Sequence, residues 1–195
     1  MRTRHEKYQA QRGQYAERDI DIKHITPVIE FGQIAAQSRA EDRADHDSHA
    51  PDRHRLAALL RRVQAGLLEL ATNADLYRGE LSDAFHVITQ VASHSLRVAR
   101  ASIWFFTDAR AAIRCADLYE QTTESHTSGI ELPATAFPRY FSELATEDAI
   151  VANQAQTDPK TAEFANSYLI PLGITSMLDV PIRSEGKMVG VICHE

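Results

Sequence analysis

The segment that decides the fold is Thr161–Glu195, TAEFANSYLIPLGITSMLDVPIRSEGKMVGVICHE. Phe164 and Tyr168 lie four residues apart, which favours one face of a short helix, and Pro171 and Gly173 end that helix. Two apolar runs follow, joined by Ser-Glu-Gly-Lys, and this arrangement predicts an antiparallel β-hairpin. Nothing in the segment is typical of catalytic machinery.

Apolar runs along the second half of the chain predict six strands, at residues 101–106, 113–119, 128–132, 149–152, 177–182 and 188–193. In the second strand, alternation predicts that four residues share one face: Ile113, Cys115, Asp117 and Tyr119. Helices are predicted after Ser82, at 137–144 with Pro138 near the start, and from Asp158-Pro159 onward. This order predicts an α+β fold, with an antiparallel sheet that bears helices on its faces.

The N-terminal part divides into a leader and a helix. Residues 1–51 predict a flexible leader, because their polar composition cannot offset the entropy of ordering the chain. Residues 52–78 predict one helix, and its apolar positions, spaced by four and three, are dimer-seam candidates: Leu56, Leu60, Val63, Leu67 and Leu70. Two interpretations stay open. The helix pairs with its twin in a homodimer and transmits movement, or it covers the sheet of its own domain.

Charge and composition restrict the partners. Residues 1–80 hold 13 Lys/Arg and 13 Asp/Glu, whereas residues 81–195 hold 8 and 14, which argues against nucleic acid or an anionic membrane as partner of the second part. No apolar run approaches the roughly 20 residues of a membrane span, and the start is not a secretion signal. Two cysteines, Cys115 and Cys193, form no disulfide framework. We therefore expect a cytoplasmic location.

Individual motifs do not predict an enzyme. His86, Gln90 and His94 lie four apart on a helix, so the two histidines are about 12 Å apart along the axis, too far to share one ion. We interpret them as a solvated polar stripe and predict no metal site. Residues 93–97 are similar to the phospho-acceptor motif of histidine kinases, but they run directly into a strand, so His94 is not expected to be phosphorylated. No catalytic residue is predicted, and no cofactor is indicated.

Five blocks in a fixed order carry a family resemblance: residues 101–106, 113–119, 137–141, 158–164 and 172–195. Over residues 81–195 the chain resembles a GAF domain of a bacterial signalling protein, of the sensor histidine kinase or diguanylate cyclase type. The resemblance implies a PAS-related sheet and a ligand pocket between the sheet and two short inserted helices. The positions that it implies for the pocket are Trp104, Phe106, Tyr119, Tyr140, Phe141, Phe164, Tyr168 and Asp179. Compared with relatives, the chain is expected to stop before the domain's C-terminal helix.

The resemblance also implies a role. A small ligand, homodimerisation or both would control a downstream output domain in signal transduction, as in two-component systems. The sequence patterns of cyclic-nucleotide binding and of bilin attachment are absent. Two alternatives stay open. One is a free methionine sulfoxide reductase that uses Cys115 and Cys193 as its thiol pair, and the other is a structural dimerisation spacer without ligand.

Overall fold

Seven antiparallel strands form one sheet in the computed structural model, which describes residues 53–74, 76 and 79–195. The strand order is β3-β2-β1-β7-β6-β5, and β4 also pairs with β2. The strands are β1 (Arg100–Phe106), β2 (Ala112–Glu120), β3 (Ser125–Thr127), β4 (Glu131–Pro133), β5 (Ile150–Ala152), β6 (Met177–Ser184) and β7 (Lys187–His194). The predicted α+β fold with an antiparallel sheet is confirmed.

The hairpin of β6 and β7 closes through a two-residue turn. Glu185 has φ 49° and Gly186 has φ 76°, and two consecutive positive φ angles are those of a type I′ turn. This turn matches the right-handed twist of the flanking strands. The hairpin predicted from Ser-Glu-Gly-Lys is thus confirmed.

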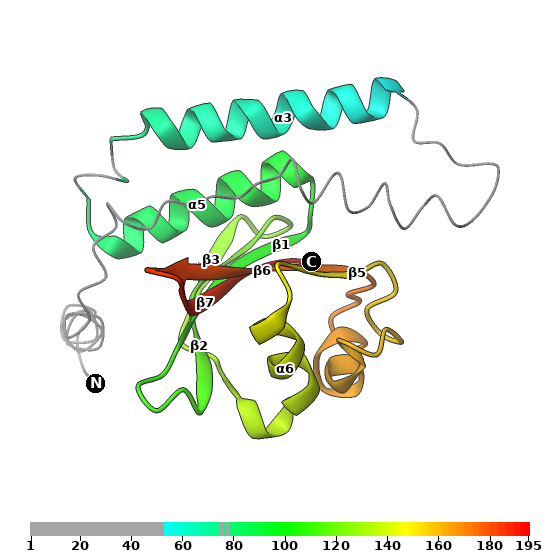
Figure 1. The fold of residues 1–195 in the computed structure, drawn as a ribbon. Helices are drawn as coiled ribbons and strands as arrows, with labels where there is room; N and C mark the ends of the chain where they lie inside the picture. Colours follow the sequence, from blue (N-terminus) through cyan, green and yellow to red (C-terminus); the bar gives the residue numbers. More distant parts are fainter. Residues whose placement is uncertain (1–52, 75, 77–78) are drawn as a thin grey trace.

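Helices lie on both faces of the sheet (Figure 1). α5 crosses one face, and α3 packs on α5 on the side away from the sheet. α6 and the two short helices η3 and η4 lie on the opposite face. The helical segments are α3 (Arg53–Thr72), α5 (Leu81–Leu96), the 3₁₀ helix η2 (Ala134–Ala136), α6 (Pro138–Thr146), the 3₁₀ helix η3 (Ala162–Phe164) and the π-helix η4 (Ala165–Leu169).

The sheet separates two hydrophobic clusters. The cluster under α5 contains Phe85, Ile103, Phe105 and Ile192. The larger cluster, on the α6 face, includes Trp104. Because side chains alternate along a strand, Ile103 and Trp104 are neighbours on β1 but belong to opposite clusters.

Gly66 allows α3 to approach α5 closely. A Cβ at this position would lie 2.2 Å from Ser95 Oγ and 3.1 Å from Val91 Cγ1. Arg62 Nε donates a hydrogen bond to the Ser95 carbonyl at 3.2 Å across the same interface. α3 therefore packs within its own chain, although on α5 and not on the sheet.

A β-bulge in β2 corrects one prediction. Ile103 pairs with Asp117 and the next residue of β1 pairs with Cys115, so that Ala116 has no partner on β1. Cys115 lies in the α6-side cluster, whereas Ala116 and the side chains of Asp117 and Tyr119 lie on the α5 side. The prediction that the odd-numbered residues of β2 share one face is wrong, because the extra residue reverses the alternation.

Other boundaries also differ from the prediction. β3 lies in a stretch predicted as a polar loop, and it pairs only with β2 at the edge of the sheet, where polar side chains reach solvent. In place of the helix predicted from Asp158, the chain forms a turn and then η3 and η4. In the turn, the Lys160 amide donates a hydrogen bond to Asp158 Oδ1 at 2.8 Å. α3 ends at Thr72, before the predicted end of the helix, and the Thr72 hydroxyl donates a hydrogen bond to the Leu68 carbonyl at 2.8 Å.

The predicted leader and positions 52, 75 and 77–78 of the predicted helix lie outside the described residues. Of the helices that the structure describes, none has both the length and the apolar character of a membrane span.

Candidate functional site

Three buried polar residues form a row across the strands on the α6 face. Ser102 on β1 pairs with Cys193 on β7, which pairs in turn with Asp179 on β6. All three are buried, and Asp179 is 0% exposed. Trp104 Nε1 donates a hydrogen bond to Ser102 Oγ at 2.8 Å, so the Trp104 indole covers one end of the row.

Asp179 is the central group of this row. The Tyr140 hydroxyl donates a hydrogen bond to Asp179 Oδ2 at 2.7 Å, whereas the buried Oδ1 accepts no hydrogen bond from any residue that the structure describes. Burial raises the pKa of Asp179 from 3.8 to about 6, against smaller opposing contributions from the Tyr140 hydroxyl and the Cys193 thiol. Burial and the nearby carboxylate also raise the pKa of Tyr140, so its hydroxyl remains a donor. Among the residues that the structure describes, Asp179 Oδ1 is thus a buried acceptor without a donor.

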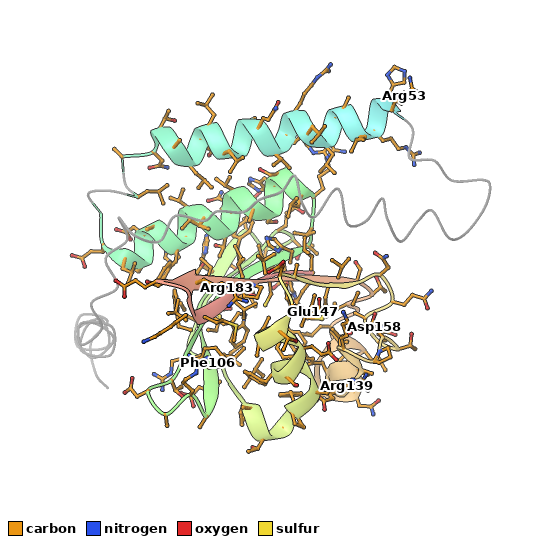
Figure 2. All side chains as sticks on the ribbon, viewed as in Figure 1. Arg53, Phe106, Arg139, Glu147, Asp158 and Arg183 are labelled. Atoms are coloured by element: carbon orange, nitrogen blue, oxygen red, sulfur yellow. The ribbon has the colours of Figure 1, made fainter. Side chains whose placement is uncertain are left out.

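Aromatic side chains cover the row, and we call Phe137, Tyr140, Phe164 and Tyr168 the aromatic lid. Phe164 stacks on Phe137 with ring centroids 4.1 Å apart and meets Tyr140 edge-on at 4.8 Å. Side chains fill the layer between α6 and the sheet (Figure 2). The lid rings therefore pack directly on one another.

Two polar contacts hold the lid. The Glu163 carboxylate, on η3, accepts hydrogen bonds from the backbone amides of Arg139 and Tyr140 at 3.2 and 3.0 Å, and thereby satisfies two free amides at the start of α6. The Tyr168 hydroxyl donates to Glu195 Oε2 at 2.9 Å. Burial, with a further contribution from the Asp179 carboxylate, raises the pKa of Glu195 to about 7. The first contact joins η3 to α6, and the second joins η4 to the residue that follows β7, so both hold the lid against the sheet.

Cys115 and Cys193 are free thiols in the cluster below the lid. Burial raises the pKa of Cys115 to about 12 and that of Cys193 well above its ordinary value of 9.0. Both side chains are therefore neutral thiols at pH 7, which are poor nucleophiles.

Seven of the eight predicted pocket residues lie together on the α6 face: Trp104, Phe106, Tyr140, Phe141, Phe164, Tyr168 and Asp179. Tyr119 lies on the α5 face because of the bulge in β2. Ser102, Cys193 and Glu195 were not among the predicted pocket residues. A serine at an inward position of an apolar strand was the one signal that could have indicated Ser102.

A second polar cluster lies on the α5 face and consists of His86 on α5, Asp117 on β2 and His126 on β3. His86 Nε2 is 3.3 Å from Asp117 Oδ1, and His126 Nδ1 is 2.9 Å from Asp117 Oδ2. The Thr89 hydroxyl donates to the same Oδ2 at 2.5 Å. We call His86, Asp117 and His126 the His–Asp–His cluster, and one ligand atom of each lies within 4.8 Å of the others.

The predicted polar stripe is thus in contact with the sheet. His86 reaches Asp117, and His94 Nε2 lies 3.3 Å from the Tyr119 hydroxyl. His86 and His94 approach different partners, so they do not share a site, as their spacing on the helix predicted. The partner that completes the cluster, His126, lies in the stretch predicted as a loop.

The dimer-seam candidates divide between two environments on α3. Val63 is buried against α5, and Leu56 and Leu70 are half-buried. Leu60 and Leu67 are 48% and 42% exposed, and the neighbouring Leu68 is 65% exposed. The outer side of α3 therefore carries an apolar strip of three leucines.

Comparison with known proteins places the fold. A GAF domain family model matches residues 80–195, more than half of the chain. The chain is similar to the chromophore-binding domain of Stigmatella aurantiaca bacteriophytochrome, at 18% identity and a TM-score of 0.52, over 71% of this chain and 51% of that chain. It therefore spans about half the length of that protein. It is also similar to the GAF domain of a phosphoenolpyruvate-protein phosphotransferase from Coxiella burnetii, at 14% identity and a TM-score of 0.50, over 71% and 77% of the two chains.

A further similar structure is the nlh2 GAF domain of A. aeolicus in an inactive state, at 15% identity and a TM-score of 0.50, over 71% and 78% of the two chains. At these identities the solved structures show the fold alone. Comparison with curated proteins gives no match.

Proposed function

Because the chain belongs to the GAF domain family, we propose that residues 80–195 are a sensory module that binds a small ligand between the aromatic lid and the sheet. Asp179 Oδ1 is the observation that carries this proposal, since it is a buried acceptor that no described residue satisfies. A ligand with an N–H or O–H donor would satisfy it. A flat ligand would also replace the stacking of Phe164 on Phe137.

Ligand entry requires the lid to move, because its rings occupy the space above Asp179. The contacts to break are the Glu163 hydrogen bonds to α6 and the Tyr168–Glu195 hydrogen bond. The π-helix η4 carries Tyr168, and π-helical turns occur frequently at functional sites. The ligand then shifts the population from a closed to an open lid.

The two thiols support a binding role rather than catalysis. A methionine sulfoxide reductase needs a thiolate as nucleophile, and the raised pKa values of Cys115 and Cys193 favour the neutral thiol. We therefore propose that this part of the chain is not an enzyme and that it regulates a downstream output domain. α5, which packs on β1 and β2, and α3, which packs on α5, would connect the sheet to such a domain.

Native mass spectrometry of freshly purified protein tests the ligand proposal. The wild type should retain a small molecule, or gain one from a fragment library, and Asp179→Leu should lose it. Tyr119→Phe is the matched control, because it removes a hydroxyl on the opposite face of the sheet. A binder whose affinity is equal in the wild type and Asp179→Leu would refute this site.

Homodimerisation through α3 is the second proposal, and the exposed strip of Leu60, Leu67 and Leu68 supports it. Leu60→Asp with Leu67→Asp should convert a dimer to a monomer in sedimentation velocity. Ala58→Asp is the control, because Ala58 is exposed and lies about 160° around the helix from Leu60. Unchanged sedimentation of the double variant would exclude this strip as the seam.

A further inference from the structure

We propose that the His–Asp–His cluster is a mononuclear site for a divalent metal ion of the zinc class, on the α5 face of the sheet. Its three ligands come from three elements: His86 from α5, Asp117 from β2 and His126 from β3. The site is separate from the lid, which lies on the other face. Its failure would leave the proposed ligand site at Asp179 untouched.

Distances within the cluster suit a small ion. Ligand atoms about 2.0–2.1 Å from a tetrahedral Zn²⁺ lie about 3.3–3.4 Å from one another. His86 Nε2 and Asp117 Oδ1 are 3.3 Å apart, which matches this spacing. His126 Nδ1 is 2.9 Å from the other oxygen, Oδ2, which is a hydrogen-bond distance, so this ring has to turn toward Oδ1. Since all three ligand groups lie within 4.8 Å, rotations of the two imidazoles suffice to close the site.

Asp117 is the ligand group whose buried negative charge favours a bound cation. Its side chain is 2% exposed, and its partners among the described residues include no Lys or Arg, only the two imidazoles and the Thr89 hydroxyl. Asp117 Oδ1 is buried and accepts no hydrogen bond in the part of the chain that the structure describes. A buried carboxylate is costly unless it is paired or binds a metal ion. Oδ1 is thus the oxygen available to a metal ion, whereas Oδ2 is held by the Thr89 hydroxyl and lies within hydrogen-bond distance of His126 Nδ1.

The ligand set indicates the class of metal. Imidazole nitrogen suits zinc and its transition-metal neighbours, whereas Mg²⁺ and Ca²⁺ prefer shells made of oxygen. The side chain of His86 is 47% exposed and that of His126 is 23% exposed, so the coordination sphere opens toward solvent. Three protein ligands with one open position allow a water or an exchangeable ligand to complete four-coordination.

The expected consequence is a clamp between the helix layer and the edge of the sheet. β3 is an edge strand of three residues, and a metal ion would tie it and β2 to α5. Because Zn²⁺ should bind the folded chain and not the unfolded chain, it should raise the midpoint temperature of thermal unfolding. Thr89 is a positioning residue, because it holds Asp117 and does not reach the ion.

Zn²⁺ titration against a chromophoric chelator tests the site on the full 195-residue chain. His86→Gln, which changes a half-exposed side chain and should fold normally, and His126→Gln are expected to lower Zn²⁺ affinity at least about 100-fold. Thr89→Val should lower it about 10–100-fold, the range for residues that orient a metal ligand. His94→Gln is the matched control on the same helix, and it should bind Zn²⁺ as the wild type does.

Two further readouts separate this site from Zn²⁺ bound elsewhere, because the chain contains nine histidines. Co²⁺ should give the visible absorption of a four-coordinate ion in the wild type and in His94→Gln, but not in His86→Gln. Excess Mg²⁺ should not displace Zn²⁺. The proposal would be overturned if His86→Gln and His126→Gln kept the Zn²⁺ affinity, Co²⁺ spectrum and thermal shift of the wild type, as His94→Gln should. The cluster would then be a hydrogen-bonded structural group.

Discussion

Asp179→Asn should remove a pH dependence of folding that the buried carboxyl group imposes. Asn has the same shape as Asp and retains an acceptor for the Tyr140 hydroxyl, but it cannot ionise. In the wild type, burial disfavours the charged form of Asp179 and raises its pKa from 3.8 to about 6. The substitution thus isolates the free-energy cost of ionising the Asp179 carboxyl group in the folded chain.

The direction of the effect follows from the protons bound in each state. Below pH 3.8 Asp179 is protonated in the folded and the unfolded chain, and between pH 3.8 and 6 the folded chain alone holds the proton. The stability contribution of Asp179 is therefore complete below pH 3.8 and is lost as the pH rises through about 6. The difference between the two pKa values, at about 1.4 kcal/mol for each pH unit, corresponds to about 3 kcal/mol.

Urea unfolding at pH 4 to 8 measures this effect, with the fluorescence of Trp104 as the signal. Trp104 is the one tryptophan of the chain and is 3% exposed, so its emission should change on unfolding. The free energy of unfolding of Asp179→Asn minus that of the wild type should increase by about 2–2.5 kcal/mol from pH 4 to pH 8, since at pH 4 the unfolded chain is already partly ionised. His194, whose pKa burial lowers, titrates in both proteins and largely cancels in the difference. Glu195 cancels only in part, because the Asp179 carboxylate adds to the effect of burial on its pKa and the substitution removes that carboxylate.

Asp148→Asn is the control, because Asp148 is exposed and its removal changes net charge by the same amount. Its difference from the wild type should stay nearly constant over the same pH range. A constant difference for Asp179→Asn as well, within about 0.5 kcal/mol, would show that Asp179 titrates as in the unfolded chain. Such a result would refute a buried, poorly solvated acceptor at Asp179 below the lid.

Three further substitutions or reactions probe the packing. Gly190→Ala should lower the free energy of unfolding by about 1–3 kcal/mol in urea titrations, because a Cβ would lie 2.1 Å from the Trp104 carbonyl oxygen and push β7 from β1. Gly66→Leu should separate α3 from α5, since a Cβ alone would lie 2.2 Å from a side-chain oxygen of α5; hydrogen exchange should then accelerate in α3 and stay unchanged in the sheet. Cys115 and Cys193 should react with a disulfide reagent at pH 7.5 only after denaturation, because burial raises both pKa values and blocks access.

The long elements could be predicted from the sequence, because their patterns reflect burial directly. β1 is buried at six consecutive positions, and its apolar run predicts a strand without reference to tertiary structure. The β6–β7 turn was predictable because Gly186 must adopt a positive φ. Alternation along the strands is enough to put Trp104 and Phe106 on one face, whereas the pocket residues on the helices were placed only by the family resemblance.

Tyr119 could not be placed, because a single unpaired residue, Ala116, reverses the alternation of β2. No composition signal marks such a bulge in this strand. β3 also escaped prediction, because its three residues are polar and it exists only through pairing with β2. Since His126 lies on β3, the His–Asp–His cluster could not be assembled from the sequence either.

The bulge links the two proposed sites physically. Without it, Asp117 would point to the α6 face, where the row at Asp179 already holds one buried carboxylate, and a second would raise the cost of ionisation. With it, Asp117 meets His86 on α5, and Cys115 remains below the lid. A movement of β1 or β2 caused by a ligand at Asp179 would therefore shift Asp117 relative to α5. The two proposed sites thus lie on opposite faces of one sheet.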